Sequence, residues 1–242
     1  MTQTGPALIA VGEDGLLVEF EAEISVRVNR KVRRLAFGIE QHRIDGVVEV
    51  VPAYRSLMVY FDPERTDLTA LGDEVDRLAA GIDPVKLPEP RLYRVPAVYD
   101  AEHGPDLERV AAAAGMSPDD VVAEFSTRRY PVYCLGFLCC LAYLGGVPER
   151  LRLPRLATPR TRLPAGSVGI AGEQAVMLPI DQPSGFHYLG RTFVTLYDPR
   201  HSPPTPVRPG DLVECPAVPE EEARSWQGRS LEECLVGSAA DS

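Results

Sequence analysis

Side chains that could carry chemistry gather in two stretches of the second half of the chain. The stretch GFLCCLAYLGG (136–146) sets two adjacent thiols, Cys139 and Cys140, in a strongly apolar run. The stretch PAGSVGIAG (164–172) sets one hydroxyl, Ser167, among three glycines. These residue types suggest a thiolate metal site, a cysteine or serine nucleophile, or a backbone cradle for a negatively charged oxygen.

The two thiols lack the spacing of metal ligands. The next cysteine, Cys134, lies five residues before Cys139, and no histidine is near in the sequence, whereas zinc sites use closely spaced thiolates and imidazoles. A cysteine nucleophile needs a neighbouring base, which His103 or His187 would supply only through the fold. Because the run is so apolar, we expect reduced, buried, structural cysteines and no metal. The nucleophile alternative stays open.

The glycine-rich stretch does not match the standard motifs. A nucleophile elbow has glycine two residues before its serine, and Ala165 stands there. The glycines also fail the dinucleotide-binding pattern. Two interpretations remain open: Gly166 and its neighbours let backbone N–H groups approach a ligand oxyanion, or they only turn the corners of a barrel.

Arginines are the other polar groups of interest. Arg55, Arg160 and Arg191 could each hold a carboxylate or phosphate with a forked pair of hydrogen bonds. The alternative is that they form ion pairs on the surface or between domains.

Composition narrows the classes of function. The chain has 242 residues, 45% of them hydrophobic, and a formal charge of −10 without a basic stripe, so we expect no nucleic-acid partner. No apolar run is long enough to span a membrane, and the N-terminus lacks the features of a signal peptide. We therefore expect a cytoplasmic protein with no membrane partner, and its five cysteines reduced.

The elements that position these groups fall into two patterns. The order of strands and helices in the first hundred residues, βαββαβ, predicts an α+β ferredoxin-like domain whose last strand is 92–99. From residue 130, short strands broken by glycine and proline predict a small β-barrel. The expected divisions are a ferredoxin-like domain (1–100), connecting helices (101–129), a barrel domain (130–218) and an acidic, partly disordered tail (219–242).

Several longer stretches resemble a known family. They are 47–63 (VVEVVPAYRSLMVYFDP), 104–122, 143–174, 190–199 and 208–214. Together they resemble the B subunit of bacterial 5-oxoprolinase, also called allophanate hydrolase subunit 1, a family that includes the kinase inhibitor KipI. The resemblance implies an N-terminal α/β domain and a C-terminal cyclophilin-like β-barrel. It also implies a homologue of the enzyme's C subunit as partner and ATP-dependent opening of a lactam; this chain alone would bind no cofactor, and ATP would enter only with the partner.

The chain departs from the family pattern at three places. The family's Gly-Phe-x-Pro-Gly-Phe-x-Tyr-Leu has Cys139, Cys140 and Leu141 where Pro-Gly-Phe is expected. Phe125 stands where the family has histidine, and Ala175–Val176 replaces Thr-Gly after Gln174. Each change makes the inherited pocket less polar, so we expect a retained scaffold with a rewritten pocket in the mouth of the barrel.

The predicted site combines the family positions with the groups above. We expect catalytic roles for Tyr143, which would orient a substrate carbonyl, and for Ser167 and Gln174. The expected substrate-binding residues are mostly apolar, with arginines as the polar minority: Arg55, Phe125, Phe137, Cys139, Arg160, Gly166, Val176, Phe186 and Arg191.

Three functions follow from these features. The first is a subunit of an ATP-dependent amidohydrolase that acts on a small cyclic amide or ureido acid, paired with a homologue of the C subunit or with itself. The second is a diverged stand-alone enzyme of secondary metabolism with a more apolar small-molecule substrate. The third is a non-catalytic, kinase-inhibitor-like binding protein.

Overall fold

A computed structural model describes residues 5–238, and the chain divides into two compact units, Met1–Pro88 and Glu89–Ser242. No helix among the described residues is long and apolar enough to cross a membrane.

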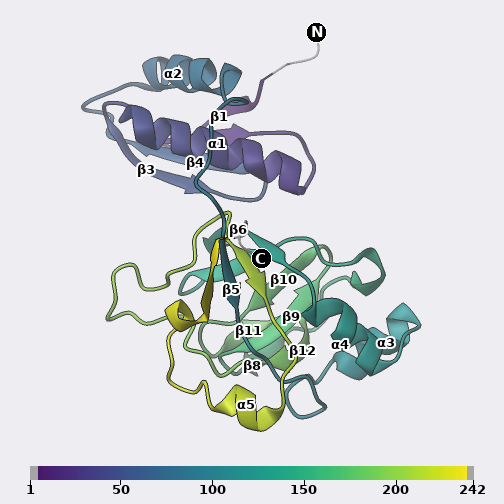
Figure 1. The fold of residues 1–242 in the computed structure, drawn as a ribbon. Coiled ribbons are helices and arrows are strands. Elements are labelled where there is room, and N and C mark those ends of the chain that lie inside the picture. Colours follow the sequence, from purple (N-terminus) through teal and green to yellow (C-terminus); the bar gives the residue numbers. More distant parts are fainter. Residues whose placement is uncertain (1–4, 239–242) are drawn as a thin grey trace. The chain divides into compact units, whose positions relative to one another are not determined.

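The first unit is a four-stranded antiparallel sheet with two helices on one face (Figure 1). Its strands, in the sheet order β1-β2-β4-β3, are β1 (Ala7–Val11), β2 (Gly15–Glu19), β4 (Ser56–Phe61) and β3 (Val47–Pro52). Every second side chain of β4 points toward the helices, so Leu57, Val59 and Phe61 are buried there, as expected for a sheet with one covered face.

The helices of the first unit begin where their caps predict. Helix α1 (Val26–His42) starts after Ser25, whose hydroxyl accepts a hydrogen bond from the Val28 amide at 3.3 Å. Helix α2 (Leu68–Ala80) starts after Asp67, whose carboxylate accepts from two amides of the first turn. These side chains satisfy N–H groups that a helix start leaves without partners.

The predicted last strand of this sheet is wrong. Residues Arg91–Arg94 form β5, which lies in the second unit between β13 (Leu212–Glu214), parallel to it, and β14 (Leu235–Ser238). The first sheet instead gains β1 as an edge strand, which the sequence analysis missed. The apolar pattern indicates a strand in each case, but pairing across more than a hundred residues depends on tertiary packing.

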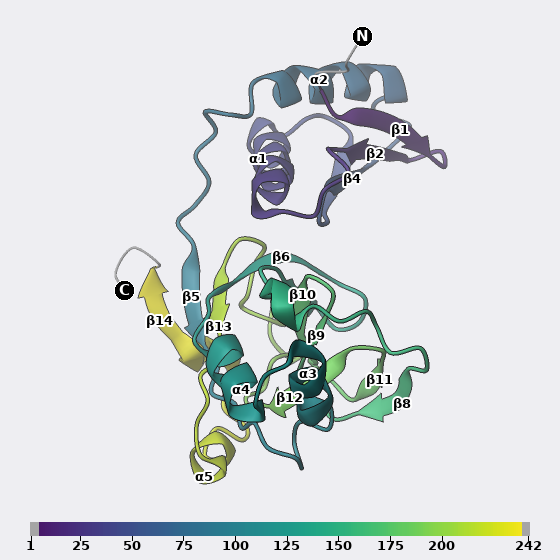
Figure 2. The same cartoon turned by 90° about the vertical axis from the view of Figure 1, so that its right-hand side faces the viewer.

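The second unit contains one mixed eight-stranded sheet, in the order β12-β9-β10-β7-β6-β13-β5-β14, and a separate two-stranded ribbon (Figure 2). The further strands of the large sheet are β6 (Tyr130–Gly136), β7 (Leu141–Leu144), β9 (Ser167–Ala171), β10 (Gln174–Met177) and β12 (His187–Arg191). The ribbon pairs β8 (Arg160–Leu163) with β11 (Gln182–Ser184). A bridge between Val98 and Arg191 joins the chain just after β5, the second-last strand, to β12 at the other end of the sheet, so the sheet curls back on itself.

Two helices join the elements around this sheet. They are α3 (Leu107–Ala114) and α4 (Pro118–Ser126), which lie side by side (Figure 2). Helix α4 begins with a capping box: the Ser117 hydroxyl accepts from the Asp120 amide, the Asp120 carboxylate accepts from the Ser117 amide, and proline follows the cap. A short 3-10 helix, η1 (Glu149–Leu151), follows β7.

The tail, expected to be acidic and partly disordered, forms regular structure over much of 220–238. Residues after 218 form α5 (Glu220–Arg224), the 3-10 helix η2 (Leu231–Cys234) and β14. The acids of this segment are exposed or half-buried, while Ala223, Leu231 and Cys234 are buried. The segment is therefore amphipathic, although its acidic composition is typical of a disordered tail. Residues 239–242 lie outside the described part of the chain.

Candidate functional site

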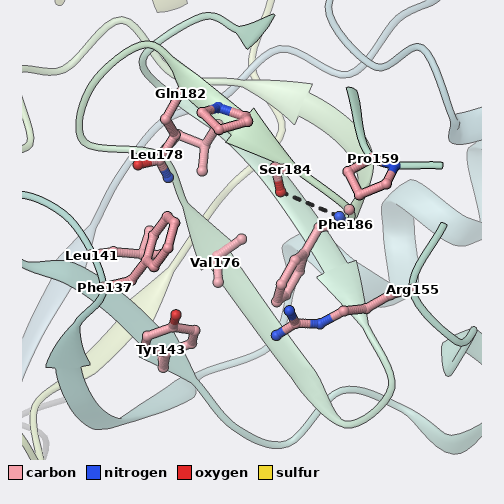
Figure 3. Close-up of a pocket in the computed structure, with 12 residues that line it drawn as sticks. Phe137, Leu141, Tyr143, Arg155, Pro159, Val176, Leu178, Gln182, Ser184 and Phe186 are labelled. Atoms are coloured by element: carbon pink, nitrogen blue, oxygen red, sulfur yellow. Dashed lines mark hydrogen bonds between the residues drawn. The ribbon is translucent and has the colours of Figure 1, made fainter. Parts of the chain in front are cut away.

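A cavity of about 200 Å³ opens in the second unit, beside the ribbon (Figure 3). Its walls come from the turn after β6, from β7 and β10, from the ribbon and the turn before β12, and from the irregular segment 152–159. The residues that line it are Phe137, Leu141, Tyr143, Arg155, Pro159, Val176, Leu178, Gln182, Pro183, Ser184, Gly185 and Phe186.

Strand register explains the apolar floor of the cavity. Val176 of β10 lies directly opposite Tyr143 of β7, and directly opposed residues of an antiparallel pair share one face of a sheet. Leu141, Leu178 and Phe186 belong to the same apolar cluster. The cavity is thus a mostly apolar recess with few polar groups, which is typical of small-molecule sites.

Arg155 supplies the only charge among the lining residues. Its Cζ atom lies 4.9 Å from the centroid of the Phe186 ring, and no carboxylate of residues 5–238 forms an ion pair with it. Burial raises the pKa of the Tyr143 phenol, and the nearby Arg155 charge offsets part of that increase. A cation over a ring face without its own counter-ion is suited to an anionic group of a ligand.

Two further polar groups face the cavity. Gln182 is 3% exposed, and its Oε1 atom has no hydrogen-bond partner among the described residues. The Ser184 hydroxyl oxygen accepts from the Phe186 amide at 3.2 Å and from the Tyr188 hydroxyl at 2.8 Å, which leaves its own hydrogen free to donate. A buried acceptor without a donor costs free energy, so Gln182 is suited to a ligand that carries an N–H group.

The lining residues can bind but are poorly equipped for acid–base chemistry. They include no histidine, cysteine, lysine, aspartate or glutamate, the side chains that most often transfer protons or attack substrates. The arrangement fits a small molecule with an anionic group, an N–H donor and an apolar body.

The structure brings four predicted site residues to this cavity. Phe137, Tyr143, Val176 and Phe186 line it. The other eight lie elsewhere: Arg55, Phe125, Cys139, Arg160, Gly166, Ser167, Gln174 and Arg191.

The glycine-rich stretch is engaged in the fold. Ser167 is 2% exposed, and its hydroxyl donates to the Pro164 carbonyl at 2.8 Å. The amides of Gly166 and Ser167 also donate to carbonyl oxygens, so they are not free to form the expected oxyanion cradle. Gly166 has φ +82°, and a Cβ atom there would lie 1.9 Å from the Thr192 carbonyl oxygen. This close approach supports the alternative in which glycine serves the backbone geometry.

The predicted arginines already have partners. Arg160 donates two hydrogen bonds to the buried Asp106 carboxylate, at 2.8 and 2.7 Å. Arg191 donates to the Ala165 carbonyl oxygen at 3.0 Å and lies over the Phe193 ring. Arg55 belongs to the first unit and pairs with Glu19 at 3.3 Å.

Two of the changes that were expected to make the pocket less polar fall in the core instead. Phe125 is fully buried between the rings of Tyr99 and Tyr130, and Ala175 is also fully buried. Gln174 begins β10 opposite Ala171 and does not line the cavity. The departures that reach the cavity are Leu141 and Val176.

The adjacent cysteines lie in a turn. They were expected to be buried, and they are only half-buried. Strands β6 and β7 form a hairpin with Gly136 opposite Leu141. Cys139 and Cys140 are half-buried free thiols at its tip, and Phe137 is 71% exposed. Burial, and then the nearby Cys139 and Cys140 thiols, raise the pKa of Tyr197. No group of three metal-ligating side chains occurs among residues 5–238, and the absence of metal stays a prediction.

The hairpin turn has a backbone that few side chains favour. Phe137, Cys139 and Cys140 have φ values of 53°, 49° and 58°, in the left-handed region. Proline fixes φ near −65°, so the Pro-Gly-Phe sequence expected from the family pattern does not permit this turn. The cysteine pair therefore accompanies a changed backbone at the edge of the cavity.

Sequence reasoning missed Arg155, Gln182 and Ser184. Arg155 lies within the family-like stretch 143–174, where one arginine of the segment LRLPRLATPRTR cannot be told from another by sequence. Gln182 stands in the turn-like sequence DQPSG, which predicts a loop. The lack of a partner, which distinguishes both side chains, is a property of the fold alone.

Comparisons with known proteins agree with this architecture. Residues 6–207 match the model of the family described as carboxyltransferase domain, subdomain C and D. The protein of Bacillus subtilis (strain 168) that is named as the B subunit of 5-oxoprolinase is 34% identical over 230 residues, which are 91% of this chain and 96% of that protein. The protein of the same name in Escherichia coli O157:H7 is 37% identical over 217 residues, which are 88% of this chain and 95% of that protein.

A solved structure is also similar. The crystal structure of TTHA0988 superposes with a TM-score of 0.74 at 34% identity over 85% of this chain, which spans only 40% of the length of that chain. The resemblance noted in the sequence is confirmed: the chain belongs to the carboxyltransferase-domain family that includes the proteins named as the B subunit of 5-oxoprolinase.

Proposed function

We propose that this chain is one subunit of an ATP-dependent amidohydrolase of the 5-oxoprolinase kind, and that its cavity binds a small cyclic amide or ureido acid. Its close relatives bear the name of one subunit of such an enzyme. The proposed fold of the chain is a ferredoxin-like domain followed by a cyclophilin-like barrel.

One observation carries the assignment of the site. Among the described residues, Arg155 has no ion-pair partner and the Oε1 atom of Gln182 has no hydrogen-bond partner, and both side chains line the same apolar recess. A cyclic amide acid such as 5-oxoproline carries a carboxylate for the arginine, a ring N–H for the glutamine oxygen and methylene groups for Val176 and Phe186. The proposal thus satisfies each unpaired group with one part of a single small molecule.

The composition of the cavity also explains why a partner is needed. The lining residues include no histidine, cysteine, lysine or carboxylate. Their hydroxyls, on Tyr143 and Ser184, thus have no such base among the lining residues to activate them. The proposed homologue of the C subunit would complete the catalytic site, and ATP would be used in the assembled enzyme. In this scheme the chain supplies binding and orientation of the substrate.

The test is reconstitution with the partner subunits, followed by measurement of ATP-dependent conversion of 5-oxoproline to glutamate. Replacing Arg155 by alanine should raise the KM for 5-oxoproline roughly tenfold or more, the usual value of a charge-assisted contact. The control is Arg162→Ala, which removes a largely exposed arginine of the same region that pairs with Asp181. Activity that is equal in both variants would place the substrate elsewhere, and absence of activity in every combination of subunits would refute the function.

A second function is favoured by a specific feature of the wall. The two departures from the family pattern that reach the cavity, Leu141 and Val176, are both aliphatic. A diverged enzyme with a more apolar acid as substrate would use the same Arg155 contact. Tighter binding of 5-oxoproline analogues with added alkyl groups would distinguish this function from the first.

A further inference from the structure

The segment that carries Arg155 is fastened to the cavity wall by two hydrogen bonds. On one side of Arg155, the Leu156 amide donates to the Gly185 carbonyl oxygen at 2.8 Å. On the other side, the Pro154 carbonyl oxygen lies 2.8 Å from Nε2 of His187. Phe186, between the two wall residues, lies under the Arg155 guanidinium.

His187 has an asymmetric environment. The side chain is 2% exposed, and its Nδ1 atom has no hydrogen-bond partner among the described residues. A carbonyl oxygen only accepts, so Nε2 carries the hydrogen in the contact with Pro154. The imidazole therefore donates one hydrogen bond to the Arg155 segment, from Nε2.

One further backbone bond holds the segment at a distance from Arg155: the Gly172 amide donates to the Leu153 carbonyl oxygen, two residues before Arg155, at 2.7 Å. Residues 152–159 form neither helix nor strand, and the guanidinium has no ion-pair partner within the described chain. The direction of this long side chain thus depends on its backbone anchors and on the Phe186 ring.

From these contacts we infer that His187 is a positioning residue that fixes Arg155 over Phe186 and so sets the preference of the cavity for anionic ligands. This inference rests on the proposed function, in which Arg155 binds the carboxylate of the ligand. His187 contacts the Arg155 segment and is not among the residues that line the cavity.

The two ring nitrogens suggest a matched pair of variants. The amide nitrogen of glutamine lies near the position of Nε2, whereas that of asparagine lies near Nδ1. His187→Gln should therefore keep the bond to Pro154, and His187→Asn should lose it while remaining polar. Leu156→Pro removes the other anchor, because proline has no amide hydrogen, and tests the inference without altering His187.

Two measurements on the full chain provide the readout. Hydrogen exchange of the Leu156 amide, which is hydrogen-bonded to Gly185, should become roughly threefold to tenfold faster in His187→Asn, as expected for the loss of one hydrogen bond in the segment, and should stay near wild type in His187→Gln. Binding of 5-oxoproline should weaken by a similar factor relative to binding of its uncharged carboxamide. Leu156→Pro should shift this ratio in the same direction.

The outcomes separate the inference from the proposed function. If Arg155→Ala weakens 5-oxoproline binding while His187→Asn and Leu156→Pro leave the ratio unchanged, His187 has no positioning role and the proposed site stands. If wild type shows no preference for 5-oxoproline over the carboxamide, both proposals fail. If His187→Asn and His187→Gln weaken both ligands equally, the histidine acts on the fold in general and the inference is wrong.

Discussion

The two stretches whose residue types suggest chemistry differ in where they lie in the structure. The run 164–172 lies in the sheet, where its hydroxyl and its first amides donate to carbonyl oxygens. The run 136–146 forms a hairpin whose turn is exposed and whose second strand lines the cavity. Glycines that look like a ligand cradle serve close packing, whereas three non-glycine residues adopt the left-handed backbone that glycine usually provides.

The largest expected effect comes from Gly166. Gly166→Ala adds a Cβ atom that would lie 1.9 Å from the Thr192 carbonyl oxygen, at φ +82°, and should lower the free energy of unfolding by about 3 kcal/mol. The control is Gly172→Ala, in the same run, where φ is +55° and no atom is within 4 Å; about 1 kcal/mol is expected there. Urea unfolding of both variants measures the difference, and equal losses would show that the close approach is unimportant.

The five thiols should differ in how readily they ionise and react. Burial raises the pKa of Cys134, Cys215 and Cys234 to about 12, so these groups stay protonated in the fold while they ionise in the unfolded chain above about pH 9. Their contribution to stability is complete below that pH and should decline by about 1.4 kcal/mol per thiol for each further pH unit.

Alkylation gives the direct comparison between these thiols and the hairpin turn. At pH 8, Cys139 and Cys140 should react with iodoacetamide before the three buried thiols, as followed by peptide mass spectrometry. Reaction of Cys215, which is fully buried, at the rate of Cys139 would mean that the two regions do not differ in accessibility.

The hairpin turn should become more stable with glycine. Cys140→Gly places the permissive residue at φ +58° and should raise the free energy of unfolding by about 1 kcal/mol. Cys140→Ala keeps the strain and serves as the control, while Cys139→Pro should disrupt the turn because proline cannot adopt φ +49°. A Gly variant no more stable than the Ala variant would contradict the left-handed backbone.

The smallest effect is expected at Ser167. Ser167→Ala removes the hydrogen bond to the Pro164 carbonyl and should cost about 1 kcal/mol of stability. Because this hydroxyl is buried and already has an acceptor, kcat of the reconstituted enzyme should remain at the wild-type value. A large fall in kcat would instead support the catalytic role that the sequence suggested.

The sequence by itself determined the local elements and the family. Caps such as Ser25 and Ser117 fix where helices begin because they act on amides two or three residues away. Local hydrogen bonds and apolar periodicity need no knowledge of the rest of the chain. Tyr143, Val176 and Phe186 were found because they stand in or beside stretches typical of the family.

Only the tertiary structure decided which polar groups are free to bind. Arg155 and Arg160 are chemically the same and five positions apart. Arg160 pairs with the buried Asp106, which precedes helix α3, whereas Arg155 lies over the Phe186 ring and has no ion pair within residues 5–238. The tertiary structure also decided the pairing of β5, which joins β13 across more than a hundred residues. Pairing of charges and strands depends on which distant segments meet, and that depends on how the whole core packs.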